Sequence, residues 1–167
     1  ERLSENELLR LMNVLAQEPL FRANLYYLAI LTGMRRSELA KLKWTDVRWE
    51  ERQIIIRNPK SGKEYEMIPL TKALAEVLKN QKEQWHLCTN KSLVVECVFF
   101  DSYGNPISKR QTCLDNWNKQ IREKAKIPNS FRLLHGLRHH IGSIHAADGT
   151  PLAVLKHWYI ILISRPS

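Results

Sequence analysis

Apolar side chains recur along the start of the chain with the spacing of an amphipathic helix. In the segment LSENELLRLMNVL, Ser4 and Glu7 have the spacing of a capping box at a helix N-terminus. Four apolar residues follow at helical intervals and share one face: Leu8, Leu11, Met12 and Leu15. The pattern predicts a helix that begins near Ser4 and buries this face.

Two further helices are expected before residue 45. The segment PLFRANLYYLAILTG (residues 19–33) is strongly apolar, and Gly33 is a typical stop signal for a helix. The segment RRSELAKLKW (residues 35–44) predicts a short third helix that buries Leu39 and Leu42. Its basic side chains are expected in solvent: Arg36, Lys41 and Lys43.

The pattern then changes to that of a β-hairpin. The segment QIIIR (residues 53–57) is rich in β-branched residues and predicts a strand. The segment EYEMIPL (residues 64–70) alternates and predicts the returning strand. The intervening NPKSGK has the composition of a turn, so lysines are expected at the hairpin tip.

The remaining pattern is mainly helical. Helices are predicted over residues 71–85, 108–126, 135–148 and 151–158, and a short buried extended run over 94–100. No repeat, linker or low-complexity segment interrupts the chain. The expected fold is therefore mostly α with a small antiparallel β-sheet, in the α+β class.

Composition narrows the function classes. With 167 residues, of which 44% are hydrophobic, the chain can form one domain with a core. Its net charge of +9 favours a polyanionic partner. The three cysteines form no CxxC pair, which argues against a disulfide framework and a zinc ribbon. No apolar run is long enough to span a membrane and no signal peptide is visible, so we expect a cytoplasmic protein.

The segment HGLRHH (residues 135–140) admits three interpretations: a metal site, a phosphate site or no site. A metal site would use His135 and His139, which are four residues apart, together with His145. The HExxH pattern of zinc hydrolases is absent, so the metal interpretation is disfavoured. We expect no metal and no other cofactor.

A phosphate site needs cations from several parts of the chain. Arg35 follows the helix-ending Gly33, and Glu38 is placed one turn later, where it can orient the guanidinium group. Lys60 and Lys63 lie at the tip of the predicted hairpin. Each of these residues alone is more often a solvated side chain, and only their combination points to phosphate.

Three segments in series resemble the catalytic domain of the tyrosine recombinases, the phage integrase family. They are TGMRRSELAKLKWTDV, KSGKEYEMIPL and HGLRHHIGS. They match the family patterns T-G-x-R-x-x-E with L-x-W-x-D, K-x-G-K with a strand ending in I-P-L, and H-x-L-R-H. They occur in the family order and at family-like separations, and the resemblance extends over about residues 3–158.

The resemblance implies a site-specific recombinase that cleaves and rejoins DNA through a 3′-phosphotyrosine, without a metal. Arg35 and Arg138 correspond to the two arginines that clamp the phosphate, because guanidinium groups match phosphate oxygens and remain charged. Lys60 corresponds to the hairpin lysine that acts as general acid, and His135 to the acid/base histidine. The supporting residues are Glu38 and His139.

The resemblance also implies partners. These are duplex DNA and, on that DNA, other recombinase protomers in a synapse of four; no membrane and no small-molecule substrate is expected. The candidate contacts to the DNA backbone are Arg36, Lys63, Lys109 and Arg110. The alternative function is a non-enzymatic DNA-binding remnant of the same fold.

The last residues depart from the family pattern. The family's second His or Trp, in an LGH motif, is expected near Ile161, where the chain reads HWYIILISRPS. The nucleophilic tyrosine is expected beyond Ser167, and Tyr159 is assigned to packing. We interpret residues 1–158 as an integrase-like catalytic domain and residues 159–167 as an aberrant or truncated tail, and we expect these 167 residues alone to be inactive.

Overall fold

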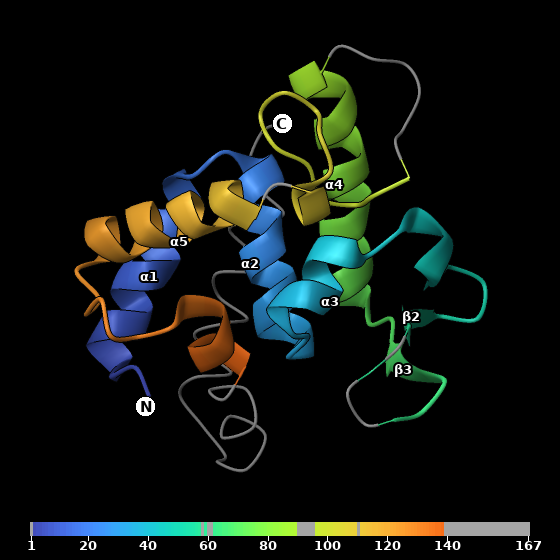
Figure 1. The fold of residues 1–167 in the computed structure, drawn as a ribbon, viewed down its shortest axis with the longest axis horizontal. Helices are drawn as coiled ribbons and strands as arrows, with labels where there is room; N and C mark the ends of the chain where they lie inside the picture. Colours follow the sequence, from blue (N-terminus) through green and yellow to red (C-terminus); the bar gives the residue numbers. More distant parts are fainter. Residues whose placement is uncertain (1, 58, 60–61, 90–95, 110, 139–167) are drawn as a thin grey trace.

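The computed structural model describes residues 2–57, 59, 62–89, 96–109 and 111–138 (Figure 1). The elements follow the chain as α1 (Glu5–Gln17), α2 (Leu20–Thr32), α3 (Arg36–Lys41), η1 (Trp44–Asp46), β1 (Val47–Arg48), β2 (Gln53–Arg57), β3 (Tyr65–Pro69), α4 (Lys72–Thr89), η2 (Ile107–Lys109) and α5 (Gln111–Ala125). A further helical segment covers residues 133–138. This architecture confirms the predicted fold class. Within the described ranges, no helix is both long and apolar enough to cross a membrane.

Helix α1 forms where the sequence predicted it. The Ser4 hydroxyl accepts a hydrogen bond from the Glu7 amide at 3.2 Å, and the Glu7 carboxylate accepts one from the Ser4 amide at 2.7 Å. The bond from the Ser4 amide lowers the pKa of the Glu7 carboxyl. The predicted face is buried: Leu8, Leu11, Met12 and Leu15. Helix α1 packs against α5, and Arg10 donates hydrogen bonds to the carbonyls of Ala125 and Lys126 at the end of α5.

Helix α2 is the central helix of the fold. Ten of its 13 residues are buried, as expected for a helix enclosed on all sides. It packs against α4 and also contacts α1 and α3, and Figure 1 shows it between α1 and α4. Gly33 ends the helix in the left-handed conformation, with φ of 69°, which confirms the predicted stop.

The sheet has three antiparallel strands in the order β1-β2-β3. Strands β2 and β3 form the predicted hairpin, in which Arg57 pairs with Tyr65 next to the tip and Gln53 pairs with Pro69 at the base. Strand β1 was missed by the sequence analysis. It has only two residues, which are too few for an alternating pattern to be visible.

Several predicted boundaries differ from the structure. The third helix ends at Lys41 and not at Trp44, and α4 continues past Trp85 to Thr89. The helix predicted from Ser108 begins at Gln111, because the chain first makes the 3₁₀ turn η2. The helix predicted from residue 135 already begins at residue 133, and the rest of the C-terminal helices lies outside the described residues. The run 94–100 is buried in part of its described length, at Val98, Phe99 and Phe100.

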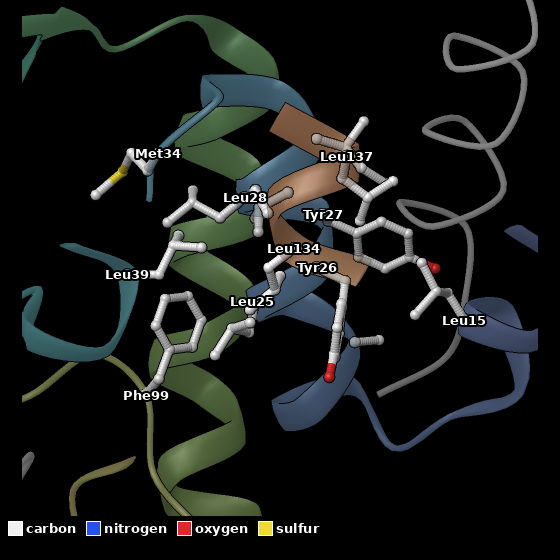
Figure 2. Packing of buried hydrophobic residues seen from close by; sticks show 14 of the residues in the cluster. Leu15, Leu25, Tyr26, Tyr27, Leu28, Met34, Leu39, Phe99, Leu134 and Leu137 are labelled. Carbon is white, nitrogen blue, oxygen red and sulfur yellow. The ribbon is translucent and has the colours of Figure 1, made fainter. Parts of the chain in front are cut away.

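The helical segment 133–138 is attached to the core through two leucines. Figure 2 shows Leu134 and Leu137 extending from this segment toward side chains of α2. They are 4% and 1% exposed, and they belong to the same hydrophobic cluster as the α2 residues Leu25, Tyr26, Tyr27 and Leu28. The position of this segment is therefore set by packing on the central helix.

Candidate phosphate site

Arg35 is placed by the turn between α2 and α3. The Thr32 hydroxyl donates a hydrogen bond to the Leu28 carbonyl at 2.7 Å and accepts one from the Met34 amide at 3.1 Å. Gly33 has a positive φ that residues with side chains rarely adopt. The threonine and glycine of the T-G-x-R segment therefore fix the backbone directly before Arg35.

Glu38 holds Arg35 at the start of α3. Its Oε2 accepts a hydrogen bond from the Arg35 backbone amide at 2.7 Å, which satisfies a donor near the start of this helix. Its Oε1 lies 3.7 Å from Arg35 Nη1. The Glu38 side chain is 13% exposed and that of Arg35 is 32% exposed. The carboxylate is thus the more buried partner, and part of the arginine remains accessible to a ligand.

The helical segment 133–138 directs its side chains to different sides. Leu134 and Leu137 point toward α2 (Figure 2). His135 and Arg138 are also three residues apart, so they share another face of the helix, and both line a cavity. His135 is exposed and Arg138 is half-buried.

Arg35, His135 and Arg138 line the same cavity, which has a volume of about 980 Å³. The turn before Arg35 lies close to Arg138. A Cβ atom placed on Gly33 would be 3.9 Å from Cγ of Arg138. Residues that are distant in the sequence are thus brought together, as a clamp around one anion requires.

The cavity is strongly basic. Among its described lining residues, seven are Lys or Arg and one is acidic. Sequence reasoning proposed Arg35, Arg36 and Arg138 for this site and missed the other four cations: Lys41, Lys119, Arg122 and Arg132. Lys119 and Arg122 follow Asp115 at the spacing of one helical face, a pattern that was visible in the sequence. Only the fold shows that this face of α5 lies opposite α3.

The sequence predicted that Arg36 extends into solvent, but in the structure its side chain forms an ion pair. Its Nη1 lies 2.6 Å from Asp115 Oδ1, so the ion pair links α3 to α5 across the cavity. The two side chains are 39% and 62% exposed, and exposed pairs of this kind contribute little stability. Their importance here is electrostatic, because Asp115 is the one carboxylate among the cations of the described lining.

A second, smaller cavity of about 290 Å³ connects Arg35 with the hairpin. Its lining includes Arg35 and Lys41 together with Ile55 and Arg57 of β2. Arg57 Nε donates a hydrogen bond to Asp46 Oδ1 at 2.5 Å, and Asp46 is 4% exposed. The aspartate of the L-x-W-x-D segment therefore ties the hairpin strand to the region of α3.

Two further predicted site residues, Lys63 and Lys109, lie in the described part of the chain. Lys63 is exposed at the hairpin tip. Lys109 lies in η2, whose other residues Ile107 and Ser108 line the larger cavity. Three predicted residues lie outside the described part of the chain: Lys60, Arg110 and His139.

The described residues contain no group of three or more His, Cys, Asp or Glu that could hold a metal ion. The metal interpretation used His139 and His145, which lie outside those residues.

Residues 1–159 match the model of the phage integrase family. The chain belongs to this family. One relative is a tyrosine recombinase XerC-like protein of Caldanaerobacter subterraneus subsp. tengcongensis, which is 28% identical; the match covers 79% of this chain and 40% of the relative. This integrase-family chain thus spans less than half of the length of that relative.

Solved structures share the fold. The XerH site-specific recombinase bound to difH substrate, in a pre-cleavage complex, has a TM-score of 0.66 and 19% identity, covering 97% of this chain and 49% of that chain. The catalytic core of lambda integrase has a TM-score of 0.64 and 19% identity, covering 95% of this chain and 90% of that chain. The fold is therefore that of a tyrosine recombinase catalytic domain.

Proposed function

We propose that this chain is the catalytic domain of a site-specific DNA recombinase, and that its larger cavity binds one DNA phosphodiester between Arg35 and Arg138. The observation that carries the proposal is the shared cavity of Arg35, His135 and Arg138, with Gly33 against Arg138. Fixed guanidinium groups from separate segments suit a phosphate, since each can offer two parallel hydrogen bonds to its oxygens.

In this proposal the cavity residues have different roles. Arg35 and Arg138 bind the non-bridging oxygens, and their stabilising effect grows as negative charge develops on the five-coordinate phosphorus. They remain charged throughout, and His135 is proposed to act as the acid/base residue beside the phosphate. Lys60 is proposed to give a proton to the departing 5′ oxygen from the hairpin tip.

The covalent step proposed is attack of a tyrosine hydroxyl oxygen on phosphorus. The bond from phosphorus to the 5′ oxygen breaks and a 3′-phosphotyrosine forms. The tyrosine hydroxyl gives its proton to His135, the proposed acid/base residue, and the released 5′ oxygen takes a proton from Lys60. Rejoining is the reverse. The family pattern places the tyrosine after residue 167, so residues 1–158 are proposed to supply the clamp and the general acid but not the nucleophile.

The extent of the basic lining supports duplex DNA as the ligand. A single phosphate occupies a small part of a cavity of about 980 Å³. The cations beyond the clamp are proposed to contact neighbouring phosphates of the same strand: Lys41, Lys119, Arg122 and Arg132. Arg36, Lys63, Lys109 and Arg110 are proposed to extend this contact, and the active form is proposed to be a synapse of four protomers.

The experiment that tests the clamp is a titration with inorganic phosphate, followed by nuclear magnetic resonance of the arginine Nε–Hε groups. The Arg35 and Arg138 signals are expected to shift with one shared dissociation constant, and Arg138→Ala is expected to abolish the shift of Arg35. Lys79→Ala is the matched control, because Lys79 is exposed on α4 and does not line the cavity. Independent binding curves for the two arginines would contradict the proposal.

The chemistry has a separate test. A chain extended with a family-like LGH and tyrosine segment is expected to form a covalent adduct with a nicked duplex that carries the cognate site, whereas the 167 residues alone form none. An extended chain that binds phosphate through both arginines yet gives no adduct would favour the alternative of a DNA-binding domain without catalysis. An adduct formed by the 167 residues alone would show that the nucleophile has been misassigned.

A further inference from the structure

Gly136 lies directly against the ring of Phe131. A Cβ atom on Gly136 would lie 2.1 Å from Cζ, 2.4 Å from Cε2 and 2.8 Å from Cε1 of that ring. Real Cβ atoms essentially never approach other atoms so closely. Phe131 is 2% exposed and belongs to the hydrophobic core, so its ring cannot turn into solvent without losing its burial.

The backbone conformation does not explain this glycine. The φ angle of Gly136 is not positive, unlike those of Gly33, Gly62 and Gly104. Its amide donates a hydrogen bond of helical type to the Arg132 carbonyl at 2.7 Å. Glycine is among the least favourable residues in a helix, so alanine would be preferred here if space allowed. The close approach of the Phe131 ring is therefore the feature that requires a residue without a side chain.

The contact lies between the two site residues of this segment. His135 precedes Gly136 and Arg138 follows two residues later, and both line the basic cavity. Leu134 and Leu137 hold the segment to α2, on a different side (Figure 2). Packing thus fixes the segment through the leucines and through Gly136, while His135 and Arg138 line the cavity.

We propose that Gly136 is a positioning residue, whose contact with Phe131 sets the place of His135 and Arg138 in the cavity. This inference rests on the proposed phosphate function. Ordinary contact begins at 3.4 Å, so relieving the closest approach of an alanine methyl, at 2.1 Å, requires a displacement of about 1.3 Å. A misplacement of about 1 Å can cost on the order of a hundredfold in rate at a catalytic site.

The test measures the affinity of the purified chain for a fluorescently labelled DNA duplex at low salt. Gly136→Ala is expected to weaken binding about tenfold, as loss of a charge-assisted phosphate contact does. Phe131→Leu removes the three ring atoms that the methyl meets and keeps an apolar side chain. Adding Gly136→Ala to Phe131→Leu is therefore expected to change the affinity less than about twofold.

A second background separates positioning from general destabilisation. In a chain that already carries His135→Ala and Arg138→Ala, Gly136→Ala is expected to have an effect of less than about twofold, because it acts through those two side chains. Thermal melting of each variant establishes that it is folded at the assay temperature.

Three outcomes overturn the proposal. They are wild-type affinity in Gly136→Ala, an equal loss of affinity in the His135→Ala, Arg138→Ala background, and a Gly136→Ala chain that does not fold at all, since the glycine would then serve the fold as a whole. Failure of the proposed function looks different: Arg138→Ala alone would leave the affinity for DNA unchanged.

Discussion

Removing one arginine of the clamp should change how salt affects DNA binding. Seven lysines and arginines line the larger cavity, and Arg36 is paired there with Asp115, the one acidic residue of its described lining. If the other six each neutralise a phosphate, the cavity alone contributes a slope of log affinity against log salt of about −5.4, so affinity falls at least about 2,000-fold between about 50 and about 200 mM salt. Arg138→Ala should make the slope shallower by about 0.9.

The assay is fluorescence anisotropy with a short labelled duplex at several salt concentrations. Arg35→Ala should shift the slope as Arg138→Ala does, and Lys79→Ala, which removes the same charge from the exposed face of α4, should leave it unchanged. A wild-type slope shallower than about −2 would refute the reasoning, because too few phosphates would then be in contact. An equal effect of Lys79→Ala would show that net charge, and not the cavity, governs binding.

Three further pairs of variants test the surroundings of the cavity. Asp115→Asn should tighten DNA binding up to about fivefold, because it removes the carboxylate among the cations of the cavity. Glu123→Gln, on the same helix but outside the cavity, should leave the affinity unchanged, and equal effects of the two variants would show that the position of the charge does not matter. Glu38→Ala should weaken DNA binding and lower the free energy of unfolding by about 1 kcal/mol. Glu38→Gln should retain most of the affinity and stability, because its side chain still accepts the hydrogen bond from the Arg35 amide, and identical losses in the two variants would contradict this. The side chains of Leu137 and Leu78 are both nearly fully buried, so replacing either with alanine should lower the free energy of unfolding by about 2–5 kcal/mol. At a temperature where both variants are folded, only Leu137→Ala should reduce the affinity for DNA.

The parts of this fold that the sequence predicted are set by local interactions. Ser4 and Glu7 cap α1 within one turn, and Gly33 ends α2 through its own conformational freedom. The hairpin followed from alternation and turn residues. Arg35 and Arg138 could be paired only through the family pattern, because no spacing rule relates helices so far apart in the chain.

The parts that were missed depend on tertiary packing. The cations of α5 were visible as one helical face, but their direction is set by how α5 packs between α1 and η2. The burial of Asp46 depends on the approach of the β2 strand, which brings Arg57 to it. Gly136 inside a predicted helix was the available signal for a close contact, yet the sequence does not show that the Phe131 ring folds back over it.

The most direct measurement is a crystal structure of this chain bound to duplex DNA. One phosphate is expected in the larger cavity, with the guanidinium groups of both Arg35 and Arg138 within hydrogen-bonding distance of its oxygens and His135 beside it. A complex in which the two arginines hold different phosphates, or in which the DNA lies on another face and leaves this cavity empty, would contradict the proposed clamp.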